Sequence, residues 1–210
     1  MNEHRLQVEK LQFLDKGPFS FSIRRGECVG LSGRSGIGKS QLFRALTDLI
    51  LSTGTVSLNG ISRDKVEAPD WRTMVTLLPT DSYWWYDLVG AHFSLENKNI
   101  ESVEEDLVQL GLPPEVLQWQ VSRLSTGEKQ RLALLRSLQS GPQVLLLDEP
   151  SSGLDPYHTE LLEVYLKRKQ QNSNLTTMWV SHDALQLSRV ADRVLVMEKN
   201  TLLKASEETG

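Results

Sequence analysis

Cysteine, long apolar runs and a secretory signal are scarce or missing in this sequence. Cys28 is the only cysteine among 210 residues, so no internal disulfide can form, as is typical of a reducing compartment. No apolar run approaches the roughly 20 residues that a membrane-spanning helix needs. Residues 1–5 are not followed by the apolar segment of a signal peptide. These absences predict a cytosolic chain that reaches a membrane only through a partner.

A strong charge of one sign is also missing. The chain has 23 Lys and Arg residues against 27 Asp and Glu residues, a formal net charge of −4. Nucleic-acid-binding domains usually carry a basic surface, so we expect no nucleic-acid partner. Hydrophobic residues make up 39% of the chain, which is enough for a sizeable core. The length predicts one globular domain over residues 1–210.

Residues 33–40 match the phosphate-binding loop pattern Gly-x-x-x-x-Gly-Lys-Ser at every fixed position. Glycines let such a loop turn tightly and point successive N–H groups at an anion. A strand pattern at residues 27–31 and a helical pattern at residues 41–46 flank the loop, which favours a nucleotide site over a surface turn. The predicted nucleotide-binding residues are Gly33, Arg34, Ser35, Gly36, Ile37, Gly38, Lys39 and Ser40.

A second informative stretch is the apolar strand pattern of residues 143–147, which ends in Asp148 and Glu149. Such a run suits a parallel strand covered on both faces, whose carboxyl end opens into a ligand crevice. One carboxylate can hold Mg²⁺, and the other can orient or deprotonate a water molecule. His182 follows another buried strand pattern, residues 176–180, so we expect it in the same crevice, against a γ-phosphate.

The remaining patterns predict an α/β fold. Alternating residues indicate strands within residues 6–31 and at residues 55–60, the latter in an antiparallel layer. Residues 74–78 indicate a buried strand, and residues 193–197 a strand that closes the sheet. Residues 102–120 have helical spacing, and the polar tail from residue 198 is expected to form a last turn and a fraying end.

Four aromatic residues stand in a row, Tyr83, Trp84, Trp85 and Tyr86. A strand buried on one face could take two of them into the core, but adjacent tryptophans rarely both point inward. We therefore favour an exposed contact surface over core packing.

In order and spacing, five segments resemble the motifs of an ATPase subunit of an ABC transporter. They are the phosphate loop, or Walker A motif, the Leu-Ser-x-Gly-Glu signature, the Walker B strand, the D-loop and the H-loop histidine. These segments cover residues 33–40, 124–128, 144–149 and 152–155, with His182 as the H-loop residue. Within the family, the chain most resembles bacterial ATP-binding subunits of iron exporters. The resemblance implies a P-loop NTPase core of the ABC type.

The resemblance also implies how the chain is divided. Residues 1–80 and 143–210 would form the RecA-like core with an antiparallel β subdomain. Residues 81–142 would form a small helical subdomain that includes the signature.

The resemblance implies a head-to-tail homodimer that holds two ATP molecules at its interface. Lys39 and the loop amides would hold the phosphates, while Ser40 and Asp148 bind Mg²⁺. Glu149 would be the general base, and His182 would position the γ-phosphate. Three further residues would act across the dimer interface. Ser125 and Gly127 would contact the γ-phosphate of the ATP held by the partner's phosphate loop, and Asp155 would couple the two ATP sites.

Three positions depart from the family pattern. Thr80 replaces the glutamine that senses Mg²⁺ and the attacking water, and we expect Asp81 or a further water to replace it in part. Thr126 stands where the signature usually has glycine. The aromatic residue that stacks on adenine is unclear: Phe13 is the nearest candidate, but spacing places the position at Asp15, so base recognition is expected to be weak.

The resemblance therefore implies ATP hydrolysis coupled to a separate integral membrane permease. The similar bacterial subunits belong to iron exporters, so the transported substrate would be iron. The chain would then sit at the cytoplasmic face of the cell membrane, and Trp84 and Trp85 would dock the permease. A soluble ABC ATPase that acts in assembly or scaffolding is the alternative. A DNA-repair ATPase is excluded, because Ser40 and Val144 are too close in sequence for a long coiled-coil insert.

Overall fold

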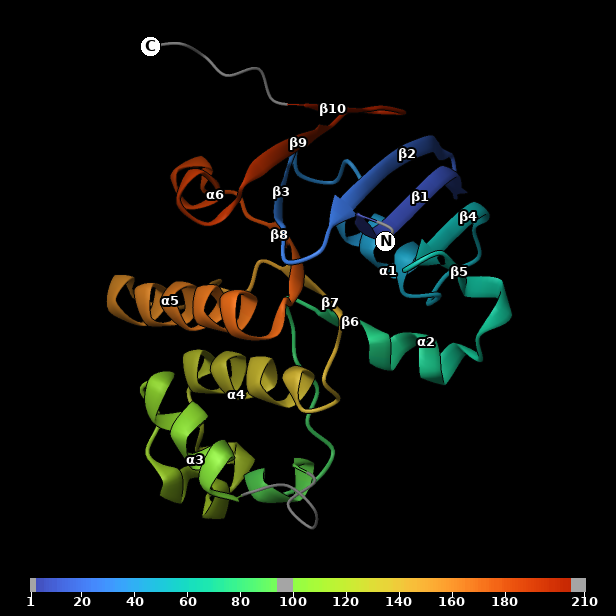
Figure 1. Cartoon of the computed structure of the whole chain (residues 1–210). Coiled ribbons are helices and arrows are strands. Elements are labelled where there is room, and N and C mark those ends of the chain that lie inside the picture. Colours follow the sequence, from blue (N-terminus) through green and yellow to red (C-terminus); the bar gives the residue numbers. More distant parts are fainter. Residues whose placement is uncertain (1–2, 94–99, 205–210) are drawn as a thin grey trace.

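Two β-sheets that differ in strand direction organise the chain (Figure 1). The computed structural model describes residues 3–93 and 100–204. The strands are β1 His4–Phe13, β2 Lys16–Arg24, β3 Cys28–Ser32, β4 Thr53–Leu58, β5 Ile61–Ser62, β6 Val75–Leu78, β7 Val144–Asp148, β8 Thr176–Val180, β9 Arg193–Met197 and β10 Leu202–Lys204. The antiparallel sheet has the order β2-β1-β4-β5, and the central sheet has the order β10-β9-β3-β8-β7-β6.

The central sheet is parallel from β9 to β6, as its apolar strand sequences predict. Every residue of β7 and of β8 is buried. Burial also raises the pKa of the Cys28 thiol to about 11, so this side chain on β3 stays neutral. The predicted strands in these regions are therefore confirmed.

The C-terminal tail corrects one expectation. The sequence predicts a last turn and a fraying end from residue 198. The turn is present, since the Glu198 amide donates to the carbonyl oxygen of Thr201 at 3.0 Å, but β10 then pairs with β9 in antiparallel register, with Leu202 opposite Met197. Leu202 packs against the buried core, and this contact holds a segment whose flanking residues are polar. The sheet therefore closes at β10 and not at β9. Residues 205–210 lie outside the described residues.

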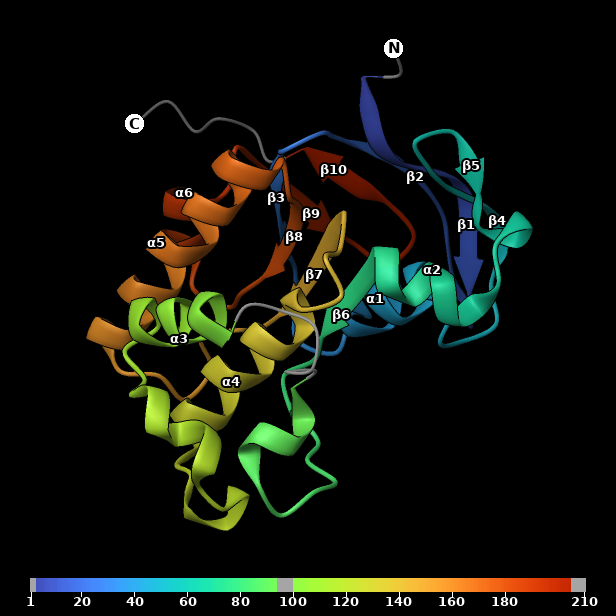
Figure 2. The same ribbon diagram turned by 60° about the horizontal axis from the view of Figure 1, so that its bottom comes forward.

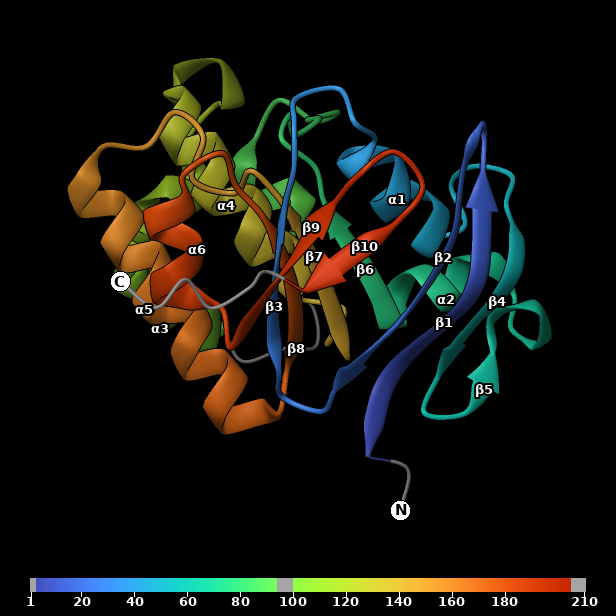
Figure 3. The ribbon, with the colours of Figure 1, turned by 90° about the horizontal axis from the view of Figure 1, so that it is seen from above.

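The helices cover both faces of the central sheet. They are α1 Lys39–Leu46, α2 Ala68–Met74, α3 Ile100–Gln109, α4 Thr126–Leu138, α5 Pro156–Ser173 and α6 Ala184–Val190, with short 3₁₀ turns at η1 Arg63–Lys65, η2 Val89–His92, η3 Pro114–Gln118 and η4 Val121–Arg123. Helices α3 to α6 lie on one side of the central sheet, and α1, α2 and the antiparallel sheet lie on the other (Figures 2 and 3). Within the described ranges, no helix combines the length and the apolar character needed to cross a membrane.

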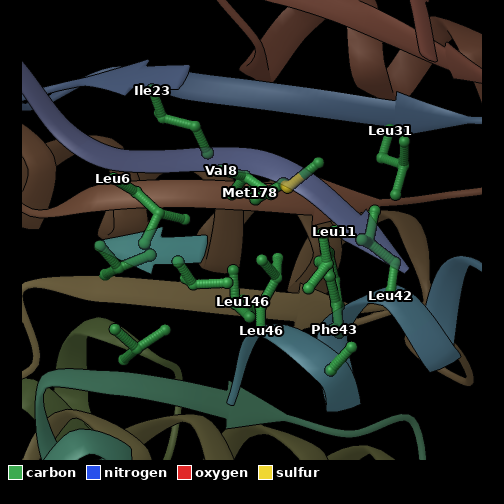
Figure 4. Packing of buried hydrophobic residues seen from close by; sticks show 14 of the residues in the cluster. Leu6, Val8, Leu11, Ile23, Leu31, Leu42, Phe43, Leu46, Leu146 and Met178 are labelled. Atoms are coloured by element: carbon green, nitrogen blue, oxygen red, sulfur yellow. The ribbon is translucent and has the colours of Figure 1, made fainter. Parts of the chain in front are cut away.

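Alternation along β7 divides the hydrophobic core in two. Leu146 packs with Met178 and the side chains of α1 and β1 in one cluster (Figure 4). Its neighbours Leu145 and Leu147 point to the opposite face, where they join the side chains of α4 and α5. Successive side chains of a strand point to opposite faces, so β7 contacts the antiparallel layer on one face and the helical layer on the other. The predicted residue boundaries between the core and a helical subdomain remain a prediction.

Two helices have no counterpart in the sequence patterns, α2 and α6. Trp71 anchors α2, because it is fully buried and its indole N–H donates to the carbonyl oxygen of Leu46 at 2.9 Å. Asp183 caps α6 by accepting a hydrogen bond from the amide of Leu185 at 2.9 Å. Both helices have seven residues, too few for a clear helical period.

We predict that Leu146→Ala lowers the free energy of unfolding by about 2–5 kcal/mol, because it opens a cavity where two layers meet. Leu51→Ala makes the same chemical change at a side chain that is 96% exposed, and should change stability by less than about 0.5 kcal/mol. Urea unfolding followed by circular dichroism measures both. Equal effects of the two substitutions would contradict this account of the core.

Candidate nucleotide site

The phosphate loop joins the end of β3 to the start of α1. Gly33, Gly36 and Gly38 adopt positive φ angles of 146°, 72° and 113°, which side-chain-bearing residues rarely adopt. A Cβ atom on Gly33 would lie 2.7 Å from the carbonyl oxygen of Met197. Gly38 is the N-cap of α1 and places no side chain on the first helical amides. Those N–H groups and the helix dipole are therefore open to an anion.

Lys39 lies inside this loop. Its side chain is 6% exposed, and its Nζ donates hydrogen bonds to the carbonyl oxygens of Gly33 at 2.8 Å and Arg34 at 3.2 Å. Neutral carbonyls hold the ammonium in place without cancelling its charge. A bound phosphate would meet a cation that is already positioned.

One cavity of about 510 Å³ brings the predicted catalytic residues together. Lys39, Ser40, Asp148, Glu149 and His182 all line it, along with Ser35, Gly36 and Gly38 of the loop. They come from the ends of β3, β7 and β8, which are neighbours in the sheet. The Ile37 side chain instead packs against the core. Gln41 and Ser152 also line the cavity. Sequence patterns gave Gln41 no role at the site, and they indicated Ser152 only as the first residue of the D-loop.

Glu149 is held in a conformation suited to a proton acceptor. It has a φ of 53°, in the left-handed region, directly after β7. Its Oε1 lies 3.2 Å from Nε2 of His182 but is buried without a hydrogen-bond partner. Burial raises the pKa of Glu149 above its ordinary value, while the nearby His182 opposes the shift. A carboxylate with a raised pKa is a stronger base than an exposed one.

Ser40 and Asp148 form the candidate Mg²⁺ donors. The Asp148 carboxylate is 7% exposed at the end of β7, and the Ser40 hydroxyl belongs to the first turn of α1. A hydroxyl and a carboxylate beside a phosphate loop fit Mg²⁺, which prefers oxygen ligands and completes its shell with water and substrate phosphates. In the described ranges no three His, Cys, Asp or Glu residues form a metal cluster, so this fit depends on a bound phosphate.

Thr80 lines the same cavity, but its hydroxyl is bonded to a backbone carbonyl. Its hydroxyl donates to the carbonyl oxygen of Asp148 at 3.1 Å. The side chain therefore ties the ends of β6 and β7 together. Asp81 is exposed and is not among the lining residues, so its predicted compensating role has no support in this arrangement.

The signature motif lies at the start of α4, outside this cavity. Ser125 is its N-cap and forms a capping box with Glu128: its Oγ accepts from the Glu128 amide at 3.2 Å, and Oε2 of Glu128 accepts from the Ser125 amide at 2.8 Å. Thr126 is exposed at the same helix start. A Cβ atom on Gly127 would lie 3.0 Å from Leu154, so the signature and the D-loop adjoin each other.

Asp155 caps α5 and is paired with His158. Oδ1 of Asp155 accepts from the His158 amide at 3.0 Å, and Oδ2 lies 2.6 Å from Nδ1 of the same residue. These contacts hold the pKa of the exposed Asp155 carboxyl below its ordinary value. Sequence analysis gave His158 no role, and only its spacing of three residues from Asp155 could have indicated one.

Three rings of the aromatic row of residues 83–86, those of Trp84, Trp85 and Tyr86, pack around the buried side chain of His92. Tyr83, Trp85 and Tyr86 are 78%, 63% and 54% exposed, while Trp84 packs against the core. Nε2 of His92 accepts from the amides of Trp85 and Tyr86, both at 3.0 Å. Three of the four aromatic side chains of this row are therefore exposed, as predicted, and only Trp84 packs against the core.

Arg136 of α4 links this row to an adjoining groove. Its guanidinium lies 4.6 Å and 4.8 Å from the ring centres of Trp84 and Trp85. The groove has a volume of about 740 Å³, and Arg72, Leu77, Tyr83, Trp85 and Arg136 are among its lining residues. We call this feature the aromatic groove.

A glycine-rich phosphate loop at the edge of a parallel sheet, facing an acidic strand end and a histidine, defines a P-loop nucleotide-binding protein. A family model described as "ABC transporter" matches residues 17–152. The chain belongs to this family, as the ordered motifs predict.

Individual relatives agree with this assignment. Protein STAR1 of Oryza sativa subsp. japonica is 36% identical over 83% of this chain, which spans 53%, about half, of that relative's length. The "Probable iron export ATP-binding protein FetA" of Escherichia coli (strain K12) is 31% identical over 85% of this chain and 82% of its own length. The solved structure of cbiO1 from Clostridium perfringens, titled part of the ABC transporter complex cbiONQ, aligns with a TM-score of 0.81 at 24% identity over 96% of this chain and 88% of its own. The predicted ABC-type α/β fold is thereby confirmed.

We predict that Thr80→Gln raises ATP turnover severalfold at saturating ATP, because a longer amide can reach water in the cavity where the threonine hydroxyl is committed to Asp148. A phosphate-release assay measures the rate. Thr80→Val, which removes the hydroxyl without adding reach, is the control and should bring no increase. An unchanged rate in the glutamine variant would show that position 80 does not limit hydrolysis.

Proposed function

We propose that this chain binds ATP and Mg²⁺ and hydrolyses ATP to ADP and phosphate. The observation that carries the proposal is the single cavity lined by Lys39, Glu149 and His182. Within it a cation and open helix amides face the Glu149 carboxylate, whose Oε1 lies 3.2 Å from the His182 imidazole. This is the set of groups that positions a phosphate chain and an attacking water.

In the proposed reaction, Lys39 and the loop amides hold the β- and γ-phosphates. Oε1 of Glu149 accepts a proton from water, whose oxygen forms a bond to the γ-phosphorus as the bond to the bridging oxygen breaks. His182 donates a hydrogen bond to the developing charge on the γ-phosphate. Mg²⁺, held by Ser40 and Asp148, would supply charge neutralisation.

The proposed active assembly is a head-to-tail homodimer. Ser125 and Gly127 lie at a helix N-terminus, a position that binds anions, yet they do not line the cavity of their own chain. A second copy could bring its signature to the γ-phosphate side of that cavity. Asp155, exposed beside the signature and oriented by His158, would then contact the partner.

The proposed partner is an integral membrane permease that places a segment in the aromatic groove. Exposed aromatic side chains beside a cation are typical of interface hot spots, and Trp84 and Trp85 are held in place by His92 and Arg136. Such a partner would hold the chain at the cytoplasmic face of the membrane. Iron export rests on the name of FetA alone, since the substrate path belongs to the permease. A soluble assembly ATPase with the same active site is the second candidate, to be distinguished by the partner.

Glu149→Gln should lower ATP turnover by at least about 100-fold, the lower range for loss of a general base, and leave ATP binding intact. With ATP and Mg²⁺, this variant should elute from gel filtration at twice the mass that it shows without nucleotide. Adding Ser125→Arg should abolish only the dimer. Full turnover in the glutamine variant would contradict the assignment of the base.

The permease proposal predicts that tagged Glu149→Gln protein, captured from detergent-solubilised membranes, recovers a protein with several membrane spans. Trp85→Ala should reduce this recovery about tenfold or more, because it removes an exposed anchor. Leu51→Ala removes an apolar side chain elsewhere that is even more exposed, 96% against 63% for Trp85, and should leave recovery unchanged. Recovery of soluble partners alone would favour the assembly ATPase.

A further inference from the structure

Most aromatic rings of the strands and helix beside the phosphate loop are inside the core. Phe21 of β2 is half-buried, packs against the same core and lines a separate cavity with Arg24 and Glu27. Phe13 of β1 and Phe19 of β2 are 2% and 1% exposed and pack on each other with ring centres 5.6 Å apart. Phe43 of α1 is fully buried. A base that enters from solvent cannot stack on rings that are covered on both faces. Phe13, the predicted candidate for stacking on adenine, is therefore buried in the core and not accessible to a base.

No other ring takes that place. Every Phe, Tyr and Trp of the sequence falls within the described ranges, and none lines the nucleotide cavity. The rings of residues 84–86 pack around His92, and Tyr157 packs on His158 at the start of α5. The turn between β1 and β2, which adjoins the loop, exposes Leu14 and Asp15 instead.

Lys16, at the first position of β2, approaches the phosphate loop more closely. A Cβ atom built on Gly38 would lie 2.7 Å from Cδ and 2.8 Å from Cε of Lys16. The hydrocarbon stem of this lysine therefore lies against the N-cap of α1, the positive end of the helix. Its side chain is 17% exposed, and in the described part of the chain its only ion-pair partner is Asp15, with Nζ 3.8 Å from Oδ1.

Gly38 is what permits this approach. With a φ of 113° and no side chain, it leaves the space that Lys16 fills. The ammonium group lies one bond beyond Cε, so a small rotation brings it to an anion at the helix start. Lys16 would thus add a second cation to the site, on the β1–β2 side of the loop, whereas Lys39 lies inside it.

We propose that this site recognises nucleotides by their triphosphate and not by their base, and that Lys16 is an additional phosphate-binding residue. The inference rests on the proposed ATPase function and specifies its substrate class. Stacking on an aromatic side chain strengthens binding of a base by about 5- to 100-fold. A site without such a ring, with two lysines and open amides, binds the part that all nucleoside triphosphates share.

Nucleotide competition tests whether the site recognises the triphosphate and not the base. Full-length Glu149→Gln protein is saturated with radiolabelled ATP in the presence of Mg²⁺, and unlabelled ATP, GTP, CTP and UTP compete in a filter-binding assay. We expect the four competitors to agree within about threefold. Preference for ATP over UTP and CTP by about tenfold or more would overturn the inference. Failure of ATP itself to bind would instead contradict the proposed function.

Substitution of Lys16 tests whether this lysine binds phosphate. Lys16→Met keeps the stem and removes the charge, and should weaken all four nucleotides alike by about tenfold, the effect of one charged hydrogen bond. Lys16→Arg should restore most of the affinity, and Lys65→Met, at an exposed lysine of η1, should have no effect. Unfolding midpoints show that the variants are folded. Wild-type affinity in Lys16→Met, or equal loss in Lys16→Arg, would overturn the role of Lys16.

Discussion

The parallel hydrogen bonding of β3, β8 and β7 is the constraint on which the rest of the structure depends. In this register, Leu31 lies opposite Val180, and Val180 lies opposite Asp148. The residues that follow each strand therefore emerge at one edge, although long stretches of sequence separate them. The phosphate loop follows β3, Glu149 follows β7 and His182 follows β8. A shift of one residue in this pairing would turn each strand over and separate the site from both halves of the core.

Backbone conformation then refines what the sheet has brought together. Gly33 and Gly38 make room for neighbouring groups at distances that a side chain would not allow, and Lys39 fills the loop that they form. Glu149 has a left-handed conformation without being glycine. Such a conformation costs about 1 kcal/mol or more, and here it belongs to the residue proposed as the base. Its buried Oε1 has only Nε2 of His182 near it, at 3.2 Å, which leaves it without a hydrogen bond of good geometry.

Two of the three departures from the family pattern concern the two ends of the expected nucleotide, the γ-phosphate and the base. At the γ-phosphate end, Thr80 is occupied by the Asp148 carbonyl oxygen. At the base end, no ring is available, and Lys16 lies against the loop. Where the family pattern has a glutamine, this chain has a hydroxyl bonded to the backbone. Where the pattern has a ring, our proposal relies on the charge of Lys16. The phosphate-binding centre between them keeps the motif residues in one cavity.

The sequence alone determined the elements whose chemistry is local. Glycine spacing predicted the phosphate loop, and apolar runs predicted the buried strands. Short elements such as α2, α6 and β10 were missed, because seven or fewer residues carry no clear period and their stability comes from contacts such as that of Trp71 with Leu46. The proximity of Thr80 to Asp148 and of Lys16 to Gly38 was decided only by the tertiary structure. Those contacts depend on side-chain direction and on packing between distant segments, which no spacing along the chain encodes.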